Sequence, residues 1–88
     1  MTNIYLYVMN DRALYDRLQD IQKMMEKRLA HGNQCGPNYL AQSPTMKNLI
    51  RRAVVYAAKF GEHYSKTELE TAALELANEA INEATCNF

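Results

Sequence analysis

The stretch RALYDRLQDIQKMMEKRLAH, residues 12–31, decides the fold class. Its apolar residues recur every three or four positions, with charged and amide residues between them: Leu14, Leu18, Ile21, Met25 and Leu29. This spacing places them on one stripe of an α-helix. We expect the helix to end near His31, because Gly32 can adopt the left-handed conformation that closes helices.

The start of this helix has two readings. The same spacing extends backwards to Ile4, which predicts one long helix over residues 3–31 with Asp11 on its apolar seam. Alternatively, residues 4–9 form a short strand and a helix covers residues 11–31, since β-branched and aromatic residues suit strands. A lone strand needs a partner, and the remaining sequence suggests none, so we prefer the long helix.

Residues 32–44, GNQCGPNYLAQSP, read as a loop because they hold two glycines, both prolines and two asparagines. Thirteen residues make a long connection in a small bundle, and long loops are often functional. Ser43 and Pro44 then give the cap and first residue of a second helix, expected over residues 45–60. Its apolar face is formed by Met46, Leu49, Ile50, Ala53, Val54, Ala57 and Phe60.

A third helix is expected over residues 66–85, because Ser65 and Glu68 have the spacing of a capping box. Its buried face is predicted to consist of small and branched residues: Leu69, Ala72, Ala73, Leu76, Ala80 and Ile81. A short turn would make the second and third helices an antiparallel hairpin. In that register Lys47 faces Glu79 and Arg51 faces Glu75.

These elements predict an all-α protein: a small three-helix domain spanning residues 1–88, with a long first helix and a helical hairpin. Its 88 residues, 48% of them hydrophobic, suffice for one small core. A core of this size favours self-association, so we expect a homo-oligomer.

The charges divide along the chain. Residues 1–66 hold ten Lys and Arg against five Asp and Glu, whereas residues 67–88 hold five Glu and no base. Opposite charges on one small body favour docking with a charged partner or with another copy.

The sequence offers little catalytic chemistry. Glycine-rich phosphate loops and nucleophile or metalloprotease motifs are absent, so we expect no enzyme. The spacing of His31, Cys35, His63 and Cys86 is unsuited to a zinc site, so neither a metal nor a cofactor is expected. No signal peptide or membrane-length apolar run occurs, and we therefore expect a cytoplasmic protein with no membrane partner and free thiols.

The candidate binding residues are basic side chains of the second helix and tyrosines that could stack on a partner or a nucleobase. They are Tyr5, Tyr7, Tyr39, Lys47, Arg51, Arg52 and Lys59.

The chain also resembles one family. Its size, its expected helical hairpin and the end of the chain, from Lys66-Thr67-Glu68-Leu69 to Phe88, look somewhat like phage proteins that sequester cyclic oligonucleotide defence signals. The similar stretch covers residues 66–88 only and assigns no binding residue. It implies an accessory protein of a phage that binds a nucleotide.

The leading hypothesis is a small non-enzymatic binding protein, an inhibitor or adaptor that acts through protein–protein contacts. The alternative is an oligomer that sequesters a small anionic ligand, a signalling nucleotide. Nucleic-acid binding through the basic second helix ranks third. A helix-turn-helix is not expected, because its recognition helix would be the third helix, whose five glutamates would be repelled by phosphate.

Overall fold

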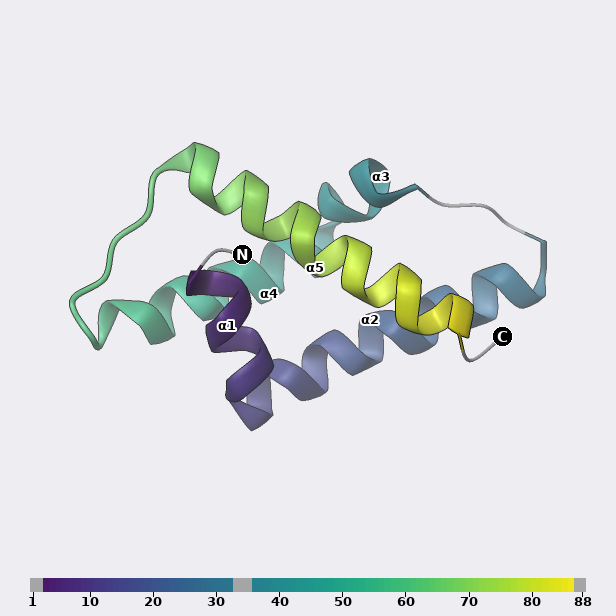
Figure 1. The fold of residues 1–88 in the computed structure, drawn as a ribbon, viewed down its shortest axis with the longest axis horizontal. Coiled ribbons are helices and arrows are strands. Elements are labelled where there is room, and N and C mark those ends of the chain that lie inside the picture. Colours follow the sequence, from purple (N-terminus) through teal and green to yellow (C-terminus); the bar gives the residue numbers. More distant parts are fainter. Residues whose placement is uncertain (1–2, 33–35, 87–88) are drawn as a thin grey trace.

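The computed structural model describes residues 3–32 and 36–86, which form helices and short connections without a strand (Figure 1). The helices are α1 (Asn3–Asn10), α2 (Arg12–Ala30), α3 (Pro37–Ala41), α4 (Pro44–Ala58) and α5 (Lys66–Cys86). The all-α prediction is confirmed for this part of the chain. The three-helix arrangement is wrong, because the described residues form five helices.

The expected long first helix is broken at Asp11. This residue is extended, at φ −99° and ψ 122°, and its carboxylate accepts a hydrogen bond from the Leu14 backbone N–H at 3.1 Å. An aspartate that caps a helix in this way satisfies an N–H without an intrahelical partner. One continuous helix over residues 3–31 is therefore wrong. In the alternative, the strand over residues 4–9 is wrong because these residues are helical, whereas the helix over residues 11–31 is confirmed by α2 and its cap at Asp11.

The segment expected as a loop contains a further helix, α3. Gly36 precedes it in an extended conformation, and Pro37 occupies its first turn. Proline is favoured there because the first N–H groups of a helix have no intrahelical partner. Leu40 anchors α3 in the core. The prediction of one loop over residues 32–44 is wrong, because Pro37 starts a helix instead of a turn.

The remaining helix ends follow the predicted caps. Ser43 Oγ accepts a hydrogen bond from the Met46 N–H at 3.2 Å. Ser65 Oγ accepts one from the Glu68 N–H at 3.2 Å, and Glu68 Oε1 accepts the Ser65 N–H at 3.5 Å. Gly32 has φ +78°, the left-handed conformation expected after α2.

Helix α5 organises the core, since it contacts each of the other four helices and lies across them in Figure 1. Its buried face consists of one leucine and several alanines: Ala72, Ala73, Leu76, Ala77, Ala80 and Ala84. Small side chains let a neighbouring helix approach closely. Every buried side chain in the described part of the chain is apolar.

Helices α4 and α5 run in opposite directions (Figure 1), and Glu79, the expected partner of Lys47, contacts α1. Glu79 accepts a hydrogen bond from the Tyr5 hydroxyl at 3.3 Å. Lys47 and Arg51 instead border a groove whose opposite wall is the first half of α5.

Candidate functional site

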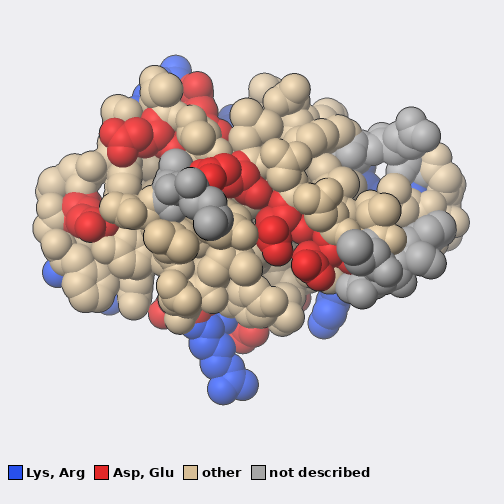
Figure 2. Space-filling view, in the orientation of Figure 1, with Lys and Arg blue, Asp and Glu red and all other residues tan. Residues whose placement is uncertain are grey.

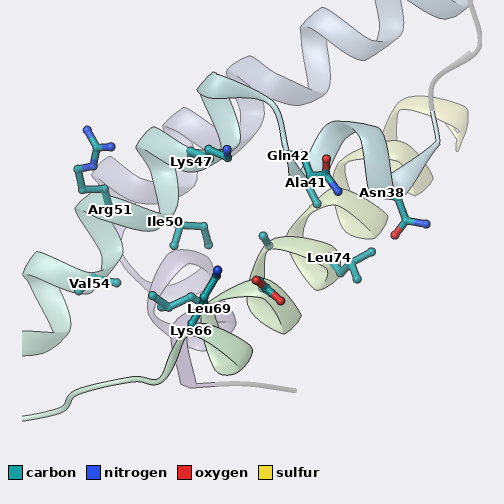
Figure 3. A pocket seen from close by; sticks show the side chains of 12 residues that line it. Asn38, Ala41, Gln42, Lys47, Ile50, Arg51, Val54, Lys66, Leu69 and Leu74 are labelled. Atoms are coloured by element: carbon teal, nitrogen blue, oxygen red, sulfur yellow. The ribbon is translucent and has the colours of Figure 1, made fainter.

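A groove of about 730 Å³ lies between α3, α4 and α5 (Figure 3). Its volume lies within the range of about 300–1,000 Å³ typical of small-molecule sites. The lining combines amides, cations and apolar side chains: Asn38, Ala41, Gln42, Lys47, Ile50, Arg51, Val54, Lys66, Leu69, Glu70, Ala73 and Leu74.

The charge of the groove is positive. Lys47 and Arg51 come from α4 and Lys66 from the first residue of α5, and they outnumber the carboxylate of Glu70 by two charges. In Figure 3 the Lys66 side chain reaches toward Ile50 and the Lys47 side chain runs along the opposite wall, whereas Arg51 points away. Two ammonium groups on facing walls are suited to holding an anion.

The floor of the groove is apolar. Ile50 is buried and Val54 and Leu69 are half-buried, while Leu74 at the margin is 37% exposed. An apolar floor under charged walls suits a ligand that carries both an anionic group and a flat or hydrophobic body. The Asn38 and Gln42 side chains of the α3 segment add donors and acceptors.

A second cavity of about 340 Å³ lies beside the groove and shares Gln42 with it. It contains Tyr39, whose side chain is 67% exposed, together with Arg28 and Met24 of α2. Tyr39 therefore lines a different cavity from Lys47, Arg51 and Lys66.

Tyr5 faces α5 from α1. Its hydroxyl donates to Glu79 Oε2, and burial followed by the charge of Glu79 raises the pKa of Tyr5 above its ordinary value. This tyrosine links α1 to the middle of α5.

Tyr7, Glu62 and Tyr64 form a second link, which we call the Glu62 clamp. Glu62 Oε2 accepts the Tyr7 hydroxyl at 2.6 Å and the Tyr64 hydroxyl at 2.5 Å. These bonds, that of Tyr64 foremost, lower the pKa of Glu62. The bond to Glu62 raises the pKa of Tyr7, while burial and then the same carboxylate raise the pKa of Tyr64.

Aromatic packing fixes the Tyr7 ring at this place. The ring is stacked on Phe60 with centroids 5.9 Å apart and meets Tyr56 edge-on at 5.6 Å. Such pairs add about 0.5–1.5 kcal/mol beyond their burial. The clamp therefore rests on an aromatic cluster that joins α1 to the end of α4.

The structure brings together some of the predicted binding residues and separates others. Lys47 and Arg51 line the groove. Arg52 is exposed on α4, and Lys59 is exposed at the end of this helix. The three tyrosines lie outside the groove: Tyr5 contacts α5, Tyr7 belongs to the Glu62 clamp, and Tyr39 lines the second cavity.

Sequence reasoning missed Lys66, Asn38 and Gln42 as groove residues. Lys66 adjoins a predicted capping box, so its position at the start of a helix was foreseeable, but the wall facing it was not. Asn38 and Gln42 depend on α3, for which Gly36 followed by Pro37 was the available signal.

The acidic residues of the sequence form a visible surface feature. Figure 2 shows carboxylates gathered along α5 on the face turned to the viewer. The division of charge along the chain therefore partly separates the molecular surface. The carboxylates lie along α5, and the groove cations lie on α4 and at the start of α5.

Among the residues described, no cluster of three or more His, Cys, Asp or Glu side chains is placed to hold a metal ion. The expectation of free thiols concerns Cys35 and the Cys86 side chain, which lie outside the described part of the structure. Within residues 3–32 and 36–86, none of the helices combines the length and apolarity needed to cross a membrane.

Comparisons with protein families, with curated proteins and with solved structures found no match. The groove and its residues are therefore the basis for a functional proposal.

Proposed function

We propose that the chain is a non-enzymatic binding protein whose α3–α4–α5 groove holds a small anionic ligand, a nucleotide of the signalling type. The observation that carries the proposal is the pairing of Lys47 and Lys66 on facing walls above the apolar floor at Ile50 and Leu69. Phosphates would bind the two ammonium groups, and a base would pack on the floor.

The sequence resemblance over residues 66–88 leads to the same ligand class. In this proposal the ligand is sequestered unchanged, because the groove supplies groups that bind and orient. Its one carboxylate, Glu70, has no histidine, cysteine or serine beside it among the described lining residues.

A protein partner is the second candidate, in line with an inhibitor or adaptor. The observation that favours it is the exposed apolar surface, with Leu74 at the groove margin and Val55 on α4, which is 61% exposed. Association of identical copies belongs to this candidate, because the acidic surface of α5 complements the basic side chains of α4. Light scattering at low and high salt tests this self-association, and a monomer at both salt concentrations would contradict it.

Nucleic-acid binding through α4 remains the third candidate. Arg52 and Lys59 are exposed on this helix and available to phosphates. A gel shift with random DNA and RNA at low salt tests this candidate, and the absence of a shift would remove it.

Thermal melting with a panel of linear and cyclic nucleotides tests the leading proposal. A bound nucleotide should raise the melting temperature progressively with the logarithm of its concentration, corresponding to a stabilisation of about 2.7 kcal/mol at 100 Kd. A flat panel would contradict the proposal.

Two variants locate the ligand. Lys47→Ala should weaken binding about tenfold, since it removes a charged hydrogen-bond donor. Lys23→Ala is the matched control, because Lys23 is an exposed lysine of α2 and does not line the groove. Equal affinities of the two variants would show that the ligand binds outside the groove.

A further inference from the structure

We infer that Glu62 is a positioning residue for the groove: by binding the hydroxyls of Tyr7 and Tyr64, it places Lys66 opposite Lys47. The inference rests on the proposed function and identifies what controls its binding site. Glu62 itself does not line the groove, so its effect on the ligand would be exerted through Lys66.

The connection between α4 and α5 leads to the groove at Lys66. It spans residues 59–65, between Ala58 and Lys66. Gly61, at φ +76°, turns the chain out of α4, and the Glu62 N–H donates to the Ala57 carbonyl at 3.3 Å. These contacts hold the first half of the connection to α4 and leave the second half to be held by other means.

The Glu62 clamp supplies that second attachment. Tyr7 is held in place because its neighbours Ile4 and Val8 are fully buried and its ring packs on Tyr56 and Phe60. Glu62 accepts the hydroxyl of this fixed ring, and the same carboxylate oxygen accepts the Tyr64 hydroxyl. This oxygen links Tyr64 to Tyr7 of α1, and a side-chain hydrogen bond with Asn3 links Tyr64 to the start of the same helix.

Lys66 follows Tyr64 by two residues and begins α5. The capping box at Ser65 fixes the direction in which α5 starts, and the side chain of Lys66 points into the groove (Figure 3). A change at Tyr64 therefore shifts Lys66 directly, whereas Lys47 is held separately on α4. The separation of the two lysines depends on a carboxylate that contacts neither the groove nor its ligand.

A double-mutant cycle tests this inference on the full chain, with ATP as the anionic probe. ATP affinity is measured by calorimetry for Glu62→Ala in the wild-type background and in a Lys66→Ala background. Glu83→Ala is the matched control, because it removes one exposed carboxylate of α5 that the clamp does not use. Glu62→Gln, which keeps an acceptor oxygen, tests rescue by a conservative change.

We expect Glu62→Ala to weaken ATP binding about threefold to tenfold in the wild-type background and to add nothing in the Lys66→Ala background. Glu62→Gln should recover part of the affinity, and Glu83→Ala should bind like the wild type. An equal loss in both backgrounds would overturn the inference, since a general loss of structure adds to the Lys66 change. No loss in either background would also overturn it.

Hydrogen exchange separates this inference from the proposed function. If the wild type binds no ATP, the proposed ligand class is contradicted for this probe, and the exchange rates decide the role of Glu62. The first-turn amides of α5 include the Leu69 N–H, bonded to the Ser65 carbonyl at 3.1 Å. Faster exchange there in Glu62→Ala than in Glu83→Ala supports the positioning role, and equal rates overturn it.

Discussion

The two halves of α5 differ in what surrounds them. In the second half, Leu76, Ala77, Ala80 and Ala84 are all buried within the core. In the first half, Lys66, Leu69, Glu70, Ala73 and Leu74 line the groove. One continuous helix is thus packed in the core along both halves, at Ala72 as well as at Leu76, and only its first half also serves as a binding wall. This change occurs between Leu74 and Leu76.

The largest expected effect comes from two leucines on either side of that change. Leu76→Ala should lower the free energy of unfolding by about 2–5 kcal/mol, because it leaves a cavity in the core. Leu74→Ala should change it by only about 0.5 kcal/mol or less, since Leu74 is 37% exposed. Urea titration measures both. Similar losses would show that the two halves are packed alike.

Two alanines sharpen the same comparison. Ala80→Leu should cost about 1–3 kcal/mol, because a larger side chain has no space between packed helices. Ala73→Leu adds the same atoms at the groove wall, where they can extend into the cavity. This variant should be less destabilised and should lose the nucleotide-induced rise in melting temperature. A variant with a normal rise would place the ligand outside the groove.

Gly61 tests the connection that leads into the first half of α5. Its φ of +76° lies in the left-handed region, so Gly61→Ala should cost about 1 kcal/mol. Gly61→Asn should cost less, because asparagine tolerates this conformation. Chemical denaturation would measure the difference. Equal stability of the wild type and Gly61→Ala would mean that this turn can change conformation freely.

The smallest effect concerns pH. The pKa of Glu62 is below its ordinary value of 4.5, so its contribution to stability is present above that pH and is lost as pH falls through the folded-state pKa. The pKa values of Tyr7 and Tyr64 are raised above 10, so their contribution is present below pH 10 and is lost at higher pH.

Melting temperatures between pH 3 and 6 check the acid side of this prediction. The wild type should lose stability more steeply below pH 4.5 than Glu62→Gln, which has no carboxylate to protonate at this position. Parallel curves would show that the clamp does not contribute to acid sensitivity.

Local signals predicted much of the fold. The caps at Ser43 and Ser65 and the left-handed Gly32 depend on residues within a few positions, and the structure has them as expected. The apolar stripe of α2 was also predictable, with four of its five residues buried and Leu29 half-buried.

The break at Asp11 was harder to predict, because the apolar spacing continues across it. Whether an aspartate within such a pattern caps a new helix depends on packing elsewhere, and here α1 contacts α4 and α5 as well as α2. Helix α3, from Pro37 to Ala41, is too short to show a helical repeat.

The groove was predictable only in part, because its shape also depends on packing between distant parts of the chain. Positive charge identified Lys47 and Arg51, but the facing wall depends on how α4 and α5 cross. The Glu62 clamp joins side chains 55 positions apart, from Tyr7 to Glu62. A single sequence contains no periodic or local signal for such a contact.

The place of α5 in the chain order affects how the protein is made. Each of the other helices precedes α5 in the chain and packs against it. While a ribosome synthesises the chain at about 5–20 residues per second, α1 to α4 emerge before the helix that covers their apolar faces. The core therefore closes after translation has passed Ala84, and until then the nascent chain displays surface that chaperones bind.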